Sequence, residues 1–195
     1  MKIQSQTFER LVLGQLFETT GPREGQDLLD HYIAVIEGKT GSLIAAAGEY
    51  GSLLSGASEE VISMVKTYGE LVGVAFQLAD DVIDIVSDGK TSGKTRGTDL
   101  REGVPTLPTI LLDRAVAAGD DSARTVRALL DADLSSDEAL DVAVEALAAH
   151  PVTQEAWQIA YDWADRAIAA IAPLPASTAK AALESFAHAV VHREG

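Results

Sequence analysis

Apolar residues recur every three or four positions along most of this chain, which is the spacing of one face of an α-helix. The first run covers residues 3–18, where Phe8, Val12 and Leu16 repeat at this interval. No run shows a convincing alternation of apolar and polar residues, the period of two that a half-buried strand requires. The pattern therefore predicts an all-α protein, with helices at residues 3–18, 26–55, 58–87, 109–118, 120–131, 136–149, 152–172 and 176–192.

Serines and a proline mark several of the expected helix boundaries. Ser58 is followed by two glutamates, an arrangement that caps the start of a helix. Ser135 or Ser136, and then Ser177, precede later helices, and serine hydroxyls accept hydrogen bonds from free backbone N–H groups there. Pro151 predicts a break, because proline lacks the N–H that continues a helix.

Four glycines interrupt the long helix expected at residues 26–55. Inside a helix each costs about 1 kcal/mol relative to alanine. One interpretation is that these small residues allow another helix or a ligand to approach closely. The alternative is a helix break near the first of them. The four are Gly38, Gly41, Gly48 and Gly51.

The amino-acid composition and net charge limit the kinds of fold and binding partner that this chain can have. The 195 residues are 47% hydrophobic and 5% aromatic, which fits one packed helical domain over residues 1–195. A net charge of −15 argues against nucleic-acid binding and against binding to an anionic membrane. An anionic substrate would therefore need a few well-placed cations or a bound metal ion. No cysteine is present, so disulfides and thiolate metal sites are excluded.

The first residues of the chain contain no apolar segment of the kind that a signal peptide has. No stretch of about 18 apolar residues predicts a transmembrane helix. We therefore expect a cytoplasmic protein without an integral membrane segment.

Three carboxylates lie inside an otherwise apolar helical run at residues 73–86: Asp80, Asp81 and Asp84. Asp80 and Asp84 are one turn apart on one helix face, where like charges cost about 0.2–0.5 kcal/mol. Mg²⁺ prefers oxygen ligands and is typically held by one or two carboxylates together with substrate phosphates. The segment therefore predicts half of a metal–diphosphate site, and the alternative is a solvated acidic face.

Lysines and arginines are half as frequent as acidic residues in this chain, so those that lie near the aspartates are candidate phosphate ligands. Lys90, Lys94 and Arg96 follow within a Gly-rich polar loop, where cations beside a metal would bind phosphate. Taken alone, this loop is equally compatible with simple solvation. Lys39, followed by Thr40, lies in the middle of a helix and either reaches a phosphate or extends its ammonium to solvent.

Together these motifs resemble the C-terminal half of the trans-isoprenyl (polyprenyl) diphosphate synthases. The resemblance covers at least residues 8–112 and rests on three motifs in order. These are the K-T pair at Lys39-Thr40, the F-Q and D-D-x-x-D motif at Phe76-Gln77 and Asp80–Asp84, and the G-K-x-x-G-x-D-L-x-E-G-x-x-T-L-P signature from Gly93 to Pro108.

The resemblance implies an isoprenoid-synthase-type helical bundle and a role for each matching residue. Asp80, Asp81 and Asp84 would hold Mg²⁺ on the diphosphate of an allylic substrate. Lys39 and Lys94 would contact that diphosphate. Thr40 and Gln77 would stabilise the allylic carbocation, and Phe76 would line the site for isopentenyl diphosphate. The implied partners are these two diphosphates and a second copy of the chain, since the family commonly forms homodimers.

Two departures from the family pattern are visible. Val104 stands where many members carry a lysine, so one diphosphate contact is missing. The family's first aspartate-rich motif, the R-R-G segment that follows it and the family's G-G-K motif for isopentenyl diphosphate are also missing from this sequence. We therefore expect an incomplete bundle that lacks N-terminal helices and is inactive alone.

Three other interpretations remain open. The chain could be a class I terpene synthase-like enzyme, which also uses acidic helix motifs to bind Mg²⁺ and diphosphate. It could be a non-catalytic helical subunit of a heteromeric prenyl synthase, as the missing first motif suggests. It could finally be an acidic helical domain whose aspartate face is merely solvated.

Overall fold

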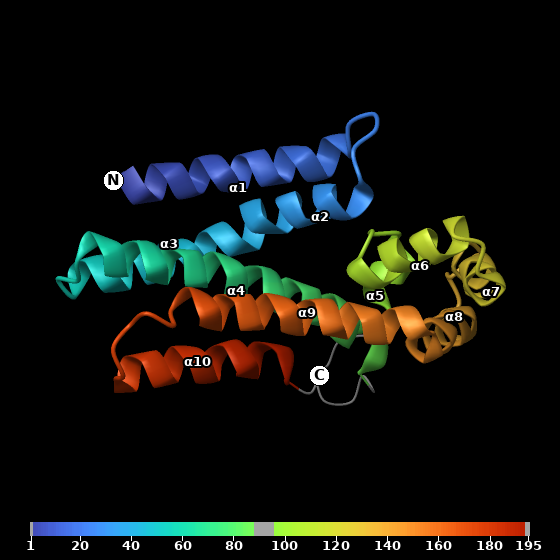
Figure 1. Cartoon of the computed structure of the whole chain (residues 1–195). Coiled ribbons are helices and arrows are strands. Elements are labelled where there is room, and N and C mark those ends of the chain that lie inside the picture. Colours follow the sequence, from blue (N-terminus) through green and yellow to red (C-terminus); the bar gives the residue numbers. More distant parts are fainter. Residues whose placement is uncertain (1, 88–95, 194–195) are drawn as a thin grey trace. The chain divides into compact units, whose positions relative to one another are not determined.

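The computed structural model describes residues 2–87 and 96–193, and within these ranges every regular element is a helix (Figure 1). The all-α prediction is therefore confirmed. The elements are α1 (Lys2–Thr20), α2 (Leu28–Ile36), the π-helix η1 (Glu37–Gly41), α3 (Ser42–Leu54), α4 (Glu59–Val86), α5 (Thr98–Glu102), α6 (Leu107–Ala117), α7 (Asp121–Leu130), α8 (Asp137–Ala149), α9 (Pro151–Ala170) and α10 (Thr178–Val191).

The chain divides into two compact units, and α4 and α9 each contribute to both. The first unit contains residues up to Gln77 together with Ala160–His192. The second contains Leu78–Ile159 together with Arg193. The single domain expected over residues 1–195 stays a prediction.

Close backbone contacts hold the first unit together. A Cβ built on Gly14 of α1 would lie 3.1 Å from the Cα of Gly38 in η1. A Cβ on Gly73 of α4 would lie 2.7 Å from the Cα of Gly41, at the end of the same π-helix. A Cβ on Gly73 would clash, and a Cβ on Gly14 would be tighter than most Cβ contacts. The π-helix η1 therefore packs backbone to backbone against both α1 and α4.

The long helix expected at residues 26–55 is thus a continuous helical path with a π-turn inside it. The backbone N–H of Ser42 donates to the Glu37 carbonyl, five residues back, which is the π-type pattern. Ser42 also donates its hydroxyl to the Gly38 carbonyl at 2.5 Å. The break near Gly38 is therefore replaced by a π-turn, whose glycines serve the close approach of neighbouring helices.

The α4 helix also joins α10 inside the first unit. Tyr68 is buried, and its hydroxyl donates to the Leu183 carbonyl at 2.7 Å. Ser177 caps α10 by accepting from the Lys180 N–H, as the sequence predicted. Figure 1 shows α10 lying alongside α9 in this unit.

The second unit is built around α6 and α8. Leu107, Ile110 and Leu112 of α6 are fully buried, as are Leu140 and Leu147 of α8. The α6 helix begins at Leu107, two residues before the expected start, because Thr106 and Thr109 form a reciprocal capping box.

Of the two serines proposed as the cap of α8, Ser136 performs this role. Its hydroxyl accepts from the Ala139 N–H at 3.1 Å. Pro151 occupies the first position of α9, where its missing N–H has no helical partner to lose.

Candidate functional site

The π-turn presents two of the residues singled out by sequence, Lys39 and Thr40. Both side chains are partly exposed. Thr40 donates its hydroxyl to the Oε1 atom of Gln77 at 3.3 Å, across 37 residues of sequence. The K-T pair and the glutamine of the F-Q pair are thereby brought together within the first unit. Phe76, beside Gln77 on α4, is partly buried.

Lys39 does not extend freely into solvent. Its ammonium donates to the Oε2 atom of Glu18, in the last turn of α1, at 2.6 Å. The Gln15 amide donates to that same oxygen at 2.7 Å. Glu18 was not predicted to belong to the site, although its position one turn after Gly14 places it on the helix face that meets η1.

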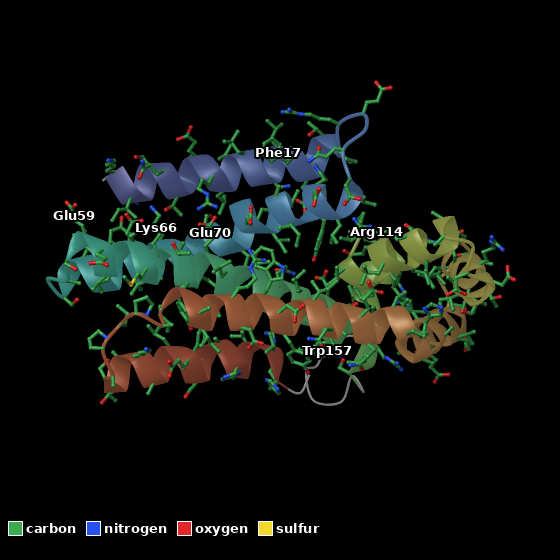
Figure 2. All side chains as sticks on the ribbon, viewed as in Figure 1. Phe17, Glu59, Lys66, Glu70, Arg114 and Trp157 are labelled. Carbon is green, nitrogen blue, oxygen red and sulfur yellow. The ribbon has the colours of Figure 1, made fainter. Side chains whose placement is uncertain are left out.

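Arg10 and Glu70 form a second charged contact beside the π-turn. Glu70, labelled in Figure 2, belongs to α4. Arg10 also donates to the Glu37 carbonyl at 3.4 Å. Burial raises the pKa of the Glu37 carboxyl, and the negative charge of Glu70 raises this pKa further. The charge on Glu37 therefore depends on its neighbours Glu70 and Arg10.

The three aspartates on α4 belong to the second unit and have distinct environments. Asp81 is only 4% exposed. Its Oδ2 atom accepts the backbone N–H of Leu107 at 3.0 Å, at the start of α6. Because this carboxylate is buried and satisfies a helix N-terminus, it has a structural task in addition to any role toward metal.

Asp80 is partly exposed and forms an ion pair with Arg193 near the end of the chain. The Arg193 guanidinium donates to the Oδ1 atom of Asp80 at 2.8 Å. No pattern in the sequence indicates this partnership, because 113 residues separate the two positions. Removing either residue would leave the other's charge without this contact.

Asp84 accepts from the backbone N–H of Asp99 at 3.3 Å, and its own carbonyl accepts from the Gly97 N–H at 2.9 Å. Burial raises the pKa of the Asp84 carboxyl most strongly, and the charges of Asp99 and Asp80 raise this pKa further. Gly97 has a φ of 73°, which favours glycine at this turn. Asp84 and Asp99 thus concentrate negative charge at one place in the second unit.

Within residues 2–87 and 96–193, no three His, Cys, Asp or Glu side chains gather closely enough to hold a metal ion by themselves. Asp80 and Asp84 would supply at most part of a shell, which fits Mg²⁺ completed by water and phosphate oxygens. Lys90 and Lys94 lie outside the described residues. Arg96, which follows them, donates from its Nε atom to the Ile85 carbonyl.

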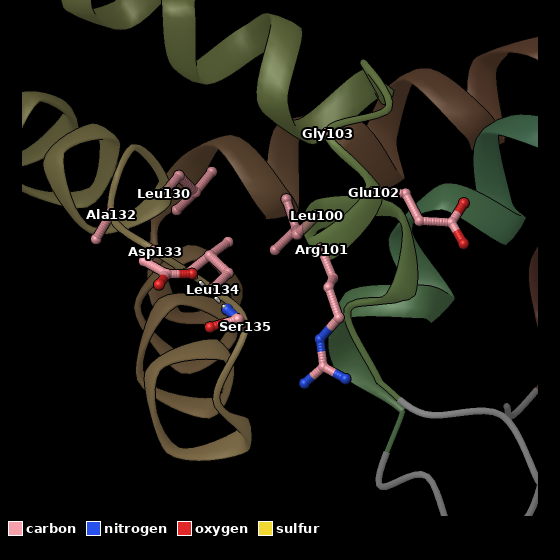
Figure 3. A pocket seen from close by; sticks show the side chains of 9 residues that line it. All are labelled: Leu100, Arg101, Glu102, Gly103, Leu130, Ala132, Asp133, Leu134 and Ser135. Atoms are coloured by element: carbon pink, nitrogen blue, oxygen red, sulfur yellow. Dashed lines mark hydrogen bonds between the residues drawn. The ribbon is translucent and has the colours of Figure 1, made fainter.

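A surface hollow of about 540 Å³ lies elsewhere in the second unit, between α5 and the segment joining α7 to α8 (Figure 3). Arg101 at this hollow pairs with Asp137 at 2.6 Å. None of the residues predicted for metal or diphosphate lines it. Val104, which replaces the lysine common at this position, is 41% exposed. The hollow is lined by Leu100, Arg101, Glu102, Gly103, Leu130, Ala132, Asp133, Leu134 and Ser135.

In the part of the chain that the structure describes, each helix is too short or too polar to cross a membrane.

The helical fold and the arrangement of the K-T and F-Q residues define a helical protein of the isoprenoid-synthase class. A family profile described as polyprenyl synthetase matches residues 1–147. The chain therefore belongs to the polyprenyl synthetase family.

Relatives with known names agree with this assignment. The chain is 40% identical over 195 residues to a nonaprenyl diphosphate synthase of Mycobacterium tuberculosis, covering all of this chain and 57% of that protein. It is 31% identical over 194 residues to an octaprenyl diphosphate synthase of Escherichia coli, covering 59% of that protein. The chain thus spans somewhat less than three fifths of the length of these relatives.

A solved structure shares the fold over the whole chain. It is the geranylgeranyl pyrophosphate synthase of Corynebacterium glutamicum, complexed with calcium and isoprenyl diphosphate. The TM-score is 0.87 at 40% identity, and the match covers 100% of this chain and 59% of that one. The predicted isoprenoid-synthase-type bundle is confirmed.

Proposed function

We propose that this chain supplies the second aspartate-rich motif of a polyprenyl diphosphate synthase. The reaction is the Mg²⁺-dependent head-to-tail condensation of an allylic prenyl diphosphate with isopentenyl diphosphate. The allylic carbon–oxygen bond ionises, a carbon–carbon bond forms to isopentenyl diphosphate, and a proton is lost from the product carbon skeleton. The single observation that carries the proposal is the Thr40–Gln77 hydrogen bond, which joins two separate family motifs.

The residues of the first unit would act on the allylic group. Lys39 would bind the departing diphosphate, because its ammonium is a strong phosphate ligand. The oxygens of Thr40 and Gln77 would face the developing positive charge and stabilise it. Phe76 would line the site for isopentenyl diphosphate.

The residues of the second unit would act on the metal and diphosphate. Asp80 and Asp84 would be the principal Mg²⁺ ligands, and Asp81 would support them while it holds the start of α6. When bound, Mg²⁺ neutralises the diphosphate that leaves. Lys94 would add a further contact to this diphosphate.

The chain alone is expected to be inactive. It spans less than three fifths of the length of the two synthases described above. The first aspartate-rich motif is absent from its sequence. Robust prenyl transfer by the purified chain at micromolar concentration would contradict this expectation.

A non-catalytic helical subunit is the second candidate function. The observation that favours it is the occupation of two proposed metal ligands, since Asp80 pairs with Arg193 and Asp81 caps α6. Such a subunit would need neither metal nor diphosphate. Mg²⁺-dependent binding of a diphosphate separates the two functions.

Self-association is part of the proposal. Phe8, Val12 and Leu16 form an exposed apolar stripe on α1, on the side away from Gly14. On α3, Leu43 and Leu54 are 50% and 83% exposed. Apolar surfaces of this kind favour pairing with a second copy. A monodisperse monomer in light scattering would contradict this part.

The first experiment is thermal unfolding with Mg²⁺, with and without a non-hydrolysable allylic diphosphate analogue. A ligand present at 100 times its dissociation constant stabilises the native state by about 2.7 kcal/mol. We expect a shift that requires both metal and analogue and that disappears in Asp80→Ala. Asp141→Ala, an exposed change on α8, is the matched control and should keep the shift.

The absence of any shift in the wild-type chain would favour the non-catalytic subunit. A shift that survives in Asp80→Ala would contradict the assignment of the metal to this motif.

A further inference from the structure

Lys39 is held by an internal anion. Its ammonium lies 2.6 Å from the Oε2 atom of Glu18, and 34% of the lysine side chain is exposed. The same oxygen accepts from Gln15, which lies one turn earlier on α1. Glu18 is therefore held in place by both Lys39 and Gln15. Its carboxylate binds the same ammonium group that a phosphate would bind.

The close packing of α1 against η1 fixes the position of Glu18 relative to Lys39. A Cβ on Gly14 would lie 3.0 Å from the backbone nitrogen of Lys39, so α1 and η1 touch through their backbones. Glu18 follows Gly14 by four residues and lies on the same face of α1. The approach that seats Gly14 against the π-turn therefore also brings Glu18 to Lys39.

We propose that Glu18 is the counter-anion of Lys39 and limits the affinity of this lysine for a diphosphate. The proposal rests on the proposed function, in which Lys39 binds diphosphate. The incoming anion displaces the Glu18 carboxylate from the ammonium or shares the ammonium with it. In both cases the carboxylate stays close and repels the ligand.

Glu18 is thus a residue that determines affinity without being a catalytic residue. An exposed ion pair of this type is weak, so a multiply charged anion can displace the carboxylate. Gln15 restrains the carboxylate beside the lysine, and the ammonium therefore stays near one position before the ligand arrives.

The test is calorimetric titration of the 195-residue chain with inorganic diphosphate in the presence of Mg²⁺. Removing one like charge beside such an anion should tighten binding by about threefold to tenfold in Glu18→Gln. Glu9→Gln is the matched control, because Glu9 is an exposed glutamate on the same helix. The gain should shrink at high salt, which screens exposed charges.

A second background shows whether the effect acts through Lys39. In Lys39→Met, the change Glu18→Gln should tighten binding by a smaller factor than it does in the otherwise wild-type chain, because the competition for the ammonium is gone and only direct repulsion remains. Equal affinities of Glu18→Gln and Glu9→Gln in the otherwise wild-type chain would overturn the proposal, and so would weaker binding by Glu18→Gln.

A ligand-free measurement separates this inference from the proposed function. Acylation of Lys39, followed by mass spectrometry with exposed Lys2 as the internal reference, should be several times faster in Glu18→Gln than in Glu9→Gln. An unchanged acylation rate would overturn the ion pair itself. A different outcome is faster acylation in Glu18→Gln without diphosphate binding by any variant. It would overturn the proposed function and the role of Glu18 in binding, but it would support the ion pair between Glu18 and Lys39.

Discussion

The buried carboxylate of Asp81 accepts the backbone N–H of Leu107 at 3.0 Å, and this contact joins α4 to the start of α6. The first N–H groups of a helix have no partner within the helix, so a buried start needs an acceptor from elsewhere. Asp81 is therefore the member of the aspartate motif with the clearest structural task.

Replacing Asp81 by alanine should lower the free energy of unfolding by about 1–3 kcal/mol, because the buried Leu107 N–H loses its acceptor. Asp81→Asn keeps an oxygen at this position and should lose less. Asp80→Ala is the comparison, since its partly exposed pair with Arg193 should contribute no more than about 1 kcal/mol. Urea denaturation of the three variants measures the differences. Equal losses in Asp80→Ala and Asp81→Ala would contradict the capping role.

Helix positions and caps could be predicted from the sequence because they depend on local patterns. The run at residues 3–18 corresponds to α1, and Ser136 and Ser177 cap the helices they precede. The all-α class followed from the same periodicity. The π-turn could not be predicted, because it depends on Gly14 and Gly73 from two other helices.

The sequence indicates which residues make up the candidate site, and their roles stay predictions; it does not indicate their contacts. The motif residues Thr40 and Gln77 do meet. The partners of the charged residues were missed, since Glu18 reaches Lys39 and Arg193 reaches Asp80 across 21 and 113 residues of sequence. Such pairings follow from the packing of helices, which a local pattern does not determine.

Tyr68 provides a prediction about the contact between α4 and α10. Tyr68→Phe should reduce the free energy of unfolding by about 1–3 kcal/mol, because the Leu183 carbonyl loses its donor. Burial also raises the pKa of the Tyr68 phenol to about 12. The unfolded state therefore ionises first as the pH rises, and wild-type stability should fall between about pH 10 and pH 12.

Urea denaturation across this pH range checks both effects. Tyr50→Phe is the control, because Tyr50 is 36% exposed and its loss should change little. A decline with pH that is as steep in Tyr68→Phe as in the wild-type chain would contradict the assignment to Tyr68.

Glu37 should make the first unit less stable at neutral pH than at acid pH. Burial raises the pKa of its carboxyl, and Glu70 raises this pKa further, although Arg10 and Arg166 oppose the shift. The folded state therefore holds this proton more tightly than the unfolded state does. The stabilisation is fully present below the ordinary pKa of 4.5 and is lost as the pH rises through the raised pKa.

Glu37→Gln should accordingly be more stable than the wild-type chain at pH 7, and this gain should disappear below about pH 4.5. Denaturation in urea at a series of pH values measures the difference. Glu60→Gln, at an exposed position in the first turn of α4, is the control and should show no comparable gain. A gain at pH 7 that persists unchanged at low pH would show that the cause is packing and not charge.

The close packing around the π-turn predicts opposite changes in the free energy of unfolding when Gly73 and Gly51 are each replaced by alanine. In Gly73→Ala the new Cβ would lie 2.7 Å from the Gly41 Cα, so α4 and η1 must separate. Overpacking of this kind costs about 1–3 kcal/mol. In Gly51→Ala the Cβ meets no atom within 4 Å, and the gain in helix propensity should add up to about 1 kcal/mol. Urea denaturation of the two variants measures both changes. Stabilisation by Gly73→Ala would show that the contact between Gly73 and Gly41 does not hold the π-turn in place.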